Sequence, residues 1–233
     1  MKIGYNWIDI IQDYLLPPTC ILCGNTGFAS RDLCYACYIH LLRNNPCCYR
    51  CGESFEIETE MPCGRCQNQT PAYDRTYAPF THQGAMRHLI TLLKFHAQYK
   101  NARLLGQLLA EHVKTTAEMP DRIMPVPLHK ARYRQRGFNQ SLEIARTVAR
   151  ELQLPLDLES CRRHRNTPHQ TDLPAKQRRK NLKNAFSLVK PIQEGHIAII
   201  DDVMTTGSTV NELATLLKKA GVGRVDVWAC ARA

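Results

Sequence analysis

Residues 197–209 read Ile197-Ala-Ile-Ile-Asp-Asp-Val-Met-Thr-Thr-Gly-Ser-Thr209, and this stretch decides the expected fold. Its apolar beginning predicts a buried strand that carries Asp201 and Asp202 to its C-terminal end. A turn rich in hydroxyl groups then leads into a predicted helix over residues 209–220. Such a turn can hold a phosphate through hydroxyls and backbone N–H groups, and a helix N-terminus favours negative charge. The plainer alternative is an acidic turn followed by an ordinary Ser/Thr helix cap.

The elements around this stretch alternate between strands and helices. Apolar residues at helical spacing predict helices in the leucine-rich segment 86–109 and over residues 138–152. Strands are predicted at residues 72–80, 122–127, 156–159, 185–189, 197–200 and 225–229. This alternation predicts an α/β fold with a mostly parallel sheet and helices on both faces. Such sheets bind ligands at the carboxyl ends of their strands, where the hydroxyl-rich turn is expected.

The 197–209 stretch resembles the phosphoribosyl-pyrophosphate (PRPP) loop of the type I phosphoribosyltransferase fold. The resemblance implies a sugar-phosphate site at the turn. The residues expected to hold the phosphate are Thr205, Thr206, Gly207, Ser208 and Thr209. Asp201 and Asp202 can accept hydrogen bonds from neighbouring ribose hydroxyls or help to hold the Mg²⁺ that accompanies PRPP. Because a fold does not determine a reaction, the loop predicts a pocket and assigns no catalytic residue.

The cysteines are unevenly distributed, since nine of the eleven fall between Cys20 and Cys66. Eight of them form four Cys-x-x-Cys pairs, with ten, ten and eleven residues between successive pairs. Each pair can present two thiolates to one tetrahedral Zn²⁺, so the pattern predicts two closed structural Cys₄ sites. Short loops favour one site from the first two pairs and another from the last two. The predicted ligands are Cys20, Cys23, Cys34 and Cys37 at the first site, and Cys48, Cys51, Cys63 and Cys66 at the second.

The same segment sets the expected domain boundaries. The expected parts of the chain are an amphipathic helix at residues 1–18, a double zinc-ribbon or treble-clef-like module at 19–70, and a phosphoribosyltransferase-like domain at 71–233. Within the module, the residues after Cys34 can start a helix. Cys47 lies beside Cys48, which leaves one ligand assignment ambiguous. The module either contacts nucleic acid or a partner, or its zinc only folds a small domain that has few aliphatic residues.

A second group of motifs makes the resemblance more specific. The motifs are Pro125-Val-Pro-Leu128, Arg136-Gly-Phe-Asn-Gln140, His164-Arg-Asn-Thr-Pro-His-Gln170 and Arg178-Arg-Lys-Asn181. Together with the cysteine pairs and Leu93-Lys-Phe95, they make the chain similar to the ComF/GntX family over nearly its whole length. The resemblance implies a double zinc ribbon joined to a phosphoribosyltransferase-like domain. It also implies an association with natural competence and the handling of incoming DNA.

On the type I fold, the segment after the predicted strand 122–127 corresponds to the loop on the pyrophosphate side. Its expected phosphate contacts are Pro127, Leu128 and His129, and the guanidinium groups that can reach a pyrophosphate are those of Arg132, Arg134 and Arg136. The stretch 164–179 corresponds to a flexible loop that closes over the site. The candidate contacts of this lid are Arg165, Gln170 and Arg178, and the alternative for each is a solvated loop residue.

The formal charge of +10 is concentrated in one part of the chain. Residues 129–183 contain fourteen Lys or Arg and five Asp or Glu, a net charge of +9. Such a region suits a polyanion such as single-stranded DNA or a small, highly charged phosphate, although it can also be a solvated face. No apolar run approaches the roughly 18 residues of a membrane helix, and Asp9 interrupts the stretch that a signal peptide keeps apolar. The protein is therefore expected to be cytoplasmic, with no membrane span.

Three functions follow as hypotheses. The favoured one is a ComF-like protein of DNA uptake that binds PRPP or a related phosphate, handles single-stranded DNA and works with other DNA-uptake proteins. The second is an active phosphoribosyltransferase that uses Mg²⁺ and PRPP with an unidentified acceptor. It requires no nucleophilic side chain, because the protein positions the reactants and stabilises the leaving pyrophosphate. The third is a regulator that senses PRPP.

Overall fold

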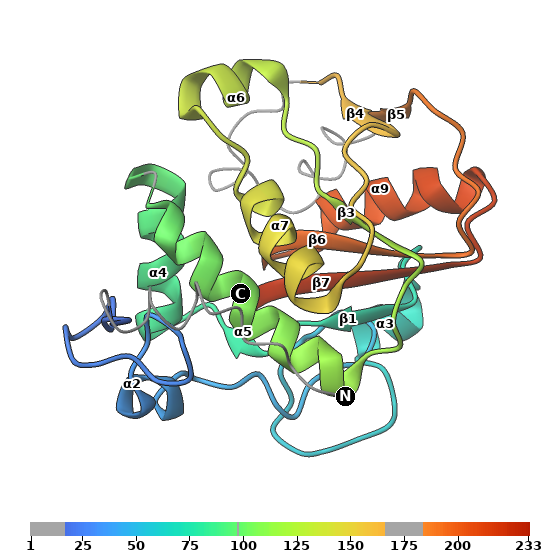
Figure 1. The fold of residues 1–233 in the computed structure, drawn as a ribbon. Helices are drawn as coiled ribbons and strands as arrows, with labels where there is room; N and C mark the ends of the chain where they lie inside the picture. The colour runs from blue at the N-terminus through green and yellow to red at the C-terminus, as the bar shows by residue number, and fades with distance from the viewer. Residues whose placement is uncertain (1–16, 97, 166–183) are drawn as a thin grey trace. The chain divides into compact units, whose positions relative to one another are not determined.

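The computed structural model describes residues 17–96, 98–165 and 184–233 of the chain, which is coloured from blue to red in Figure 1. Contacts divide the chain into two compact units, residues 1–41 and residues 42–233. The division falls inside the cysteine-rich segment, between its second and third Cys-x-x-Cys pairs. Most of the amphipathic helix expected at residues 1–18 lies outside the described residues.

The smaller unit carries the first two cysteine pairs. Helix α2 (Tyr35–Ile39) begins directly after Cys34. The Sγ atom of Cys34 accepts a hydrogen bond from the backbone N–H of Cys37 at 3.4 Å. A predicted metal ligand therefore also caps this helix, and the helix start expected after Cys34 is confirmed.

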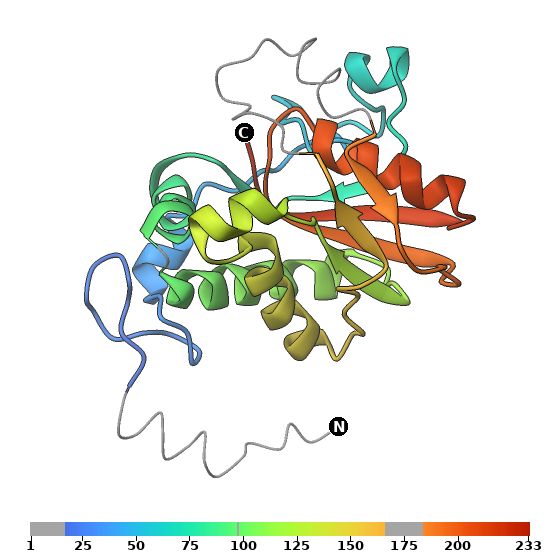
Figure 2. The same cartoon turned by 90° about the horizontal axis from the view of Figure 1, so that it is seen from above.

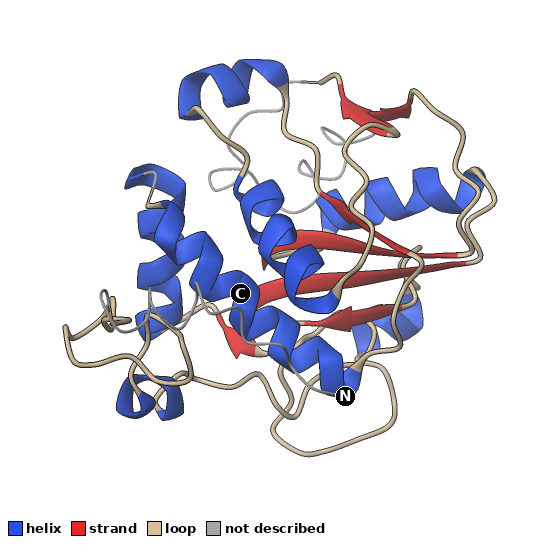
Figure 3. Cartoon of the chain, viewed as in Figure 1, coloured by secondary structure: helices blue, strands red, loops and turns tan. Residues whose placement is uncertain are grey.

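The larger unit contains a parallel sheet with the strand order β1-β7-β6-β3, drawn in red in Figure 3. The strands are β1 (Arg75–Tyr77), β3 (Arg122–Pro125), β6 (His196–Met204) and β7 (Arg224–Arg232), and the short strand β2 (Phe80–Thr81) also pairs with β7. The described pairings within this sheet are all parallel. Strands β6 and β7 consist mainly of buried residues, because both faces of the sheet are covered. The predicted parallel sheet is confirmed.

Helices cover both faces of this sheet, as Figure 2 shows. Helices α5 (Tyr99–Thr116) and α7 (Gln140–Leu152) pack on one face, and α9 (Ser208–Lys219) packs on the other. Helices α5 and α7 come close at Gly106, where an added Cβ atom would lie 2.6 Å from the Cβ atom of Thr147. Helix α4 (Gly84–His96) precedes α5. Among the described helices, none combines the length and the apolar character that crossing a membrane requires.

Two strands differ from the sequence-based predictions. Strand β6 does not end at Ile200 but continues to Met204, because it pairs with β7 along its whole length. Asp201 and Asp202 therefore lie within the strand and not after it. Residues 156–159 form no strand of the sheet, and Leu156 makes only an isolated bridge with Ile123.

Two further elements lie apart from the main sheet. Strand β5 (Phe186–Leu188) forms an antiparallel hairpin with β4 (Cys161–Arg163). The strand predicted at 185–189 therefore exists but does not join the parallel sheet. Helix α6 (Lys130–Arg136) forms in a basic segment without an apolar pattern, and none of its residues is buried. Hydrophobic spacing gives no signal for such a helix.

Residues 42–70 are part of the larger unit and are attached to its sheet. Arg232, at the end of β7, donates a hydrogen bond to the carbonyl oxygen of Cys51 at 3.0 Å and contacts the carboxylate of Glu53 at 2.5 Å. The same segment contains the short helix α3 (Gly64–Asn68). The last two cysteine pairs are therefore built into the unit that carries the sheet.

Candidate functional site

The carboxylates of Asp201 and Asp202 lie near the C-terminal end of β6, and each has its own partner. The hydroxyl of Ser141, in the first turn of α7, donates a hydrogen bond to Oδ1 of Asp201 at 3.0 Å. The ammonium group of Lys94, in α4, lies 2.7 Å from Oδ2 of Asp202. Side chains from two helices thus hold the acid pair in position.

The two carboxyl groups differ in acidity. Burial, followed by the neighbouring Asp202, raises the pKa of Asp201 to about 7. Burial also opposes the ionisation of Asp202, but the ammonium group of Lys94 and the N–H of Val203 lower the pKa of Asp202 below its ordinary value. Near neutral pH, Asp202 is therefore ionised while Asp201 is partly protonated. Such a pair can exchange hydrogen bonds with the hydroxyls of a sugar.

The turn after β6 is built around Gly207, whose φ angle is 74°. An added Cβ atom would lie 2.7 Å from Cε of Met204 and 2.9 Å from the hydroxyl oxygen of Tyr73, so this position requires glycine. The hydroxyl groups of Thr206 and Ser208 lie 2.8 Å apart, and Ser208 begins α9. Hydroxyl groups and the N–H groups of a helix start therefore meet in one turn, which is an arrangement that can hold a phosphate. The other two residues predicted to hold the phosphate are Thr205, which is exposed, and Thr209, which is half-buried.

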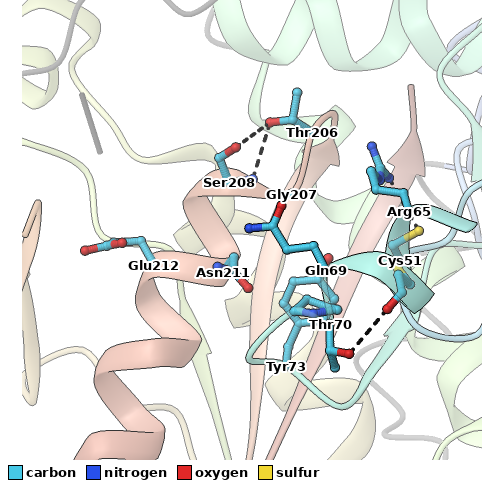
Figure 4. A pocket seen from close by; sticks show the side chains of 12 residues that line it. Cys51, Arg65, Gln69, Thr70, Tyr73, Thr206, Gly207, Ser208, Asn211 and Glu212 are labelled. Carbon is cyan, nitrogen blue, oxygen red and sulfur yellow. Dashed lines mark hydrogen bonds between the residues drawn. The ribbon is translucent and has the colours of Figure 1, made fainter. Parts of the chain in front are cut away.

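A polar cavity of about 160 Å³ lies beside this turn (Figure 4). One wall is the start of α9, which contributes Asn211, and the other is the segment around α3, which contributes Arg65 and Gln69. The N–H of Ala72 donates a hydrogen bond to Oδ1 of Asn211 at 2.8 Å and so links the two walls. Cys51 and Cys66 also line the cavity, so the second cysteine cluster borders the predicted phosphate turn.

The loop after β3 lies at the same edge of the sheet as the acid pair, because β3 and β6 are parallel neighbours. It contains Pro127, Leu128 and His129, as the resemblance implies. The Nδ1 atom of His129 accepts a hydrogen bond from the N–H of Ala131 at 3.2 Å and thereby caps α6. The predicted imidazole contact thus has a structural role before any ligand binds.

Helix α6 carries the three predicted arginines of this loop. Burial, followed by Arg136, lowers the pKa of Arg132, whereas Arg134 is exposed. The guanidinium carbon of Arg136 lies 5.9 Å from the ring centre of Phe95. Two of the three cations are therefore held partly out of water, where their attraction for a phosphate is stronger.

Arg163, in β4, is a basic residue that no sequence motif singles out. Burial, followed by the nearby Arg132, lowers the pKa of Arg163 to about 10, while the carboxyl group of Asp201 acts in the opposite direction. A cavity of about 530 Å³ is lined by Arg163, His129 and Asn139, among other residues of the hairpin and the loop after β3. Arg163 therefore adds a basic group near both the acid pair and the α6 arginines.

The proposed lid is only partly described. Arg165 follows β4 and is exposed. Gln170 and Arg178 lie outside the described residues. The hairpin of β4 and β5 flanks the segment that contains them.

The eight predicted metal ligands form two separate clusters, with the pairing that the loop lengths favour. In each cluster the four sulfur atoms lie within 4.8 Å of one another. The Sγ atoms of Cys23 and Cys34 are 3.6 Å apart, and those of Cys51 and Cys63 are 3.5 Å apart. A tetrahedron with Zn–S bonds of about 2.3 Å has edges of roughly 3.8 Å, so both clusters fit structural zinc. Cys47 belongs to neither cluster, which resolves its ambiguity.

Comparison with known proteins agrees with these two kinds of site. The double zinc ribbon domain family matches residues 11–67, and the phosphoribosyl transferase domain family matches residues 139–232. The chain is 36% identical to competence protein F of Haemophilus influenzae, across 92% of this chain and 96% of that protein. The chain belongs to the competence protein F (ComF) family.

Other relatives of this ComF-family chain include the DNA utilization protein YhgH of Escherichia coli K12. The two are 37% identical across 93% of this chain and 98% of that protein. Among solved structures, glutamine PRPP amidotransferase from B. subtilis, complexed with ADP and GMP, matches with a TM-score of 0.38 and 22% identity. That match covers 55% of this chain and 26% of the other. The ComF-family chain thus combines a double zinc ribbon with a phosphoribosyltransferase-type domain.

In this ComF-family chain, the residues that contact the predicted ligands carry little signal in the sequence. Lys94 follows Ile90 by four positions and so falls on the apolar side of its helix, where a lysine signals a buried partner. Ser141 and Tyr73 carry no such signal, because serine at a helix start and tyrosine before a strand are ordinary. Arg163 is one of many arginines in the basic region, and only its burial distinguishes it.

Proposed function

We propose that this ComF-family protein binds PRPP, or a related sugar phosphate, between the Asp201–Thr209 segment and the loop after β3. The observation that supports the proposal is the order of groups along this edge of the sheet. A hydroxyl-lined helix start comes first, the acid pair follows, and basic side chains including Arg132 and Arg163 lie beyond it. PRPP presents a phosphate, ribose hydroxyls and a pyrophosphate in the same order.

Each group has a defined role in this proposal. The turn at residues 205–209 receives the 5′-phosphate, because its N–H groups and hydroxyls, two of which bond each other in the free protein, can donate to an anion at a positive helix end. Asp201 and Asp202 accept hydrogen bonds from the ribose hydroxyls. The arginines of α6 and Arg163 bind the pyrophosphate oxygens. Mg²⁺ bound with PRPP would neutralise part of the pyrophosphate charge.

We also propose that the protein handles single-stranded DNA. The names of its relatives refer to competence and DNA utilization. The net charge of +9 over residues 129–183 suits a polyanion. On α6, the exposed Tyr133 and Arg134 offer an aromatic ring and a cation, the two groups that single strands commonly contact.

A second candidate function is transfer of the ribosyl phosphate to an acceptor. The cavity of about 530 Å³ beside Arg163 supports it, since cavities of this size accommodate small ligands. In that reaction the bond between C1 of the ribose and the pyrophosphate breaks, and a nitrogen of the acceptor forms the new bond to C1. The protein would orient the two reactants and stabilise the departing pyrophosphate.

Titration with Mg²⁺ and PRPP tests the first proposal. PRPP is expected to raise the Tm of the wild type, and the Asp201→Asn/Asp202→Asn double variant is expected to lose this increase. Thr206→Val, which leaves the acid pair unchanged, is expected to lose most of it as well. Lys190→Gln, in the exposed loop after β5, is the matched control. Failure of PRPP to stabilise the wild type, or equal stabilisation of all variants, would refute the proposal.

A further inference from the structure

A groove of about 580 Å³ lies in the larger unit, away from the acid pair. Three elements form it: the segment around residues 43–49, strand β1 and the last turns of α5. None of its lining residues lines either of the two cavities described above. Its lining includes Arg43, Tyr49, Arg75, Tyr77 and His112.

The groove is basic. Arg43 and Arg75 are both exposed, and none of the described residues that line the groove is an acid. Burial, followed by Arg43, lowers the pKa of His112, so the positive charge comes from the arginines and not from the imidazole. A groove lined by cations and by no carboxylate attracts anions, and the Glu111 carboxylate, which acts on His112 against Arg43, lies outside its lining.

Aromatic rings hold the cations of the groove in place. The guanidinium carbons of Arg50 and Arg75 each lie 5.7 Å from the ring centre of Tyr49. The guanidinium carbon of Arg43 lies 4.7 Å from the ring centre of Phe80. Cation–π contacts of this kind restrict long side chains, so less entropy is lost when the cations bind a ligand.

The groove also contains an unused hydrogen-bonding group. Tyr77 is 8% exposed, and its hydroxyl has no hydrogen-bond partner among the described residues. A buried hydroxyl without a partner is costly, typically by about 1–3 kcal/mol, so a group that fills this role is expected in the functional state. A phosphate oxygen is a strong acceptor for such a hydroxyl.

We infer that this groove binds the phosphodiester backbone of single-stranded DNA, with Arg43 and Arg75 contacting successive phosphates and the Tyr77 hydroxyl donating to one of them. The inference rests on the proposed handling of single strands and assigns them a site separate from the PRPP site. The Tyr77 hydroxyl oxygen is enclosed in the free protein, so its donation to a phosphate requires this side chain to turn toward the groove; a flexible single strand can follow the groove to that point. A duplex, which stays stiff over about 150 base pairs, cannot bend into it.

Binding of a fluorescent oligothymidylate of about 15 nucleotides, followed by anisotropy, tests the inference. The Arg43→Gln/Arg75→Gln double variant is expected to bind about tenfold more weakly than the wild type. Its log–log salt slope is expected to fall by about 1.4, since each phosphate contact to a single strand contributes roughly 0.7. The Lys190→Gln/Lys219→Gln variant removes the same charge from two exposed lysines outside the groove and is expected to bind like the wild type.

Two tyrosine substitutions test the geometry. Tyr49→Phe keeps the ring that positions Arg50 and Arg75 and is expected to bind normally, whereas Tyr49→Ala is expected to weaken binding about fivefold. Tyr77→Phe is expected to weaken binding severalfold without lowering the Tm. If Tyr77→Phe leaves affinity unchanged, the hydroxyl is not a ligand and the proposed contact is wrong.

The outcomes separate this inference from the proposed function. PRPP at saturation is expected to leave the affinity ratio between the wild type and the Arg43→Gln/Arg75→Gln variant unchanged, because the groove shares no residue with the PRPP site, whereas any contact of the oligonucleotide with α6 responds to PRPP. If the wild type binds no oligonucleotide, the proposed handling of DNA fails together with the groove. If the wild type binds but the groove variant and the lysine control weaken equally, only the groove assignment fails. Equal affinity for a duplex of the same length would also overturn the groove assignment.

Discussion

Asp201 and Asp202 are adjacent in the sequence, yet their partners give them different acidities. Asp202 faces the Lys94 ammonium group at 2.7 Å. Asp201 is half-buried, has no cation in hydrogen-bond contact among the described residues, and accepts a hydrogen bond from the hydroxyl of Ser141. The same residue type in the same strand is therefore ionised at one position and partly protonated at the next, because acidity depends on the surroundings of the charge.

This difference predicts how stability changes with pH. The pKa of Asp201 is about 7 in the folded state, compared with about 3.9 in an unfolded chain. Between these pH values the folded state holds a proton that the unfolded state has released, so the contribution of Asp201 to stability falls as pH rises from about 4 to 7. Asp201→Asn stays neutral and keeps the oxygen that Ser141 contacts. Its Tm is expected to exceed that of the wild type by several degrees at pH 8 and to match it at pH 4, as measured by calorimetry.

Asp202→Asn is a control that is expected to change the Tm in the opposite direction. The substitution removes the partner of the Lys94 ammonium group, which is only 25% exposed. The Tm of Asp202→Asn is therefore expected to fall at pH 8, because a partly buried cation loses its counter-charge. If both substitutions change the Tm in the same direction at pH 8, the assigned difference in acidity is wrong.

Gly207 is the residue on which the shape of the proposed phosphate turn depends. Gly207→Ala and Gly221→Ala both place a side chain at a positive φ, 74° and 97° respectively, which costs roughly 1–2 kcal/mol in each case. Only at Gly207 would the new Cβ atom meet Met204 and Tyr73, since nothing lies within 4 Å at Gly221. Both variants are expected to have a lower Tm than the wild type. Only Gly207→Ala is also expected to lose PRPP binding, as measured by calorimetric titration. Normal PRPP affinity in Gly207→Ala would show that the turn does not contact the ligand.

At the scale of elements, the two cysteine clusters belong to different compact units. In the second cluster, Cys48, Cys51 and Cys66 share a buried core with Tyr73 and residues of the sheet. Arg232 connects Cys51 to the end of β6 through the carbonyl oxygen of Met204, at 3.0 and 3.2 Å. The second cluster is therefore linked through the hydrogen bonds of Arg232 to the turn that begins after Met204.

Single ligand substitutions test this connection. Cys63→Ser is expected to remove one zinc ion per chain and to weaken PRPP binding about tenfold or more, because α3 and Tyr73 lose their fixed position beside Gly207. Cys23→Ser is expected to remove one zinc ion without changing PRPP affinity. Metal analysis and calorimetric titration measure the two effects. Equal PRPP affinity in the two variants would show that the second cluster does not support the turn.

At the scale of the whole molecule, the division at residues 41 and 42 makes truncations informative. A fragment of residues 42–233 is expected to fold and bind PRPP like the full chain. A fragment of residues 71–233, cut at the boundary that the cysteine spacing favours, is expected to aggregate, because it exposes the sheet surface that Cys48, Cys51 and Cys66 cover. Circular dichroism and size-exclusion chromatography distinguish the outcomes. A folded, monomeric 71–233 fragment would contradict this expectation.

The sequence could predict those features that depend on residues close together along the chain. The strand at 197–200, the helix that starts near Thr209 and the pairing of the cysteines all follow from spacing, and the structure contains each of them. Helix α6 could not be predicted in this way, because it buries none of its residues and so lacks an apolar pattern. The hairpin of β4 and β5 could not be predicted either, since its strands come from opposite sides of the segment 166–183.

Local patterns and motifs in the sequence were enough to predict the family, the parallel α/β fold, the hydroxyl-rich turn after the central strand and the two sets of four cysteines. Which side chains meet across long stretches of chain became clear from the packing of the folded protein. It placed Lys94 on Asp202, Ser141 on Asp201, Arg163 near the acid pair and the second cysteine cluster beside Gly207. These contacts depend on how helices and strands pack, and packing joins residues whose separation along the chain leaves no periodic signal.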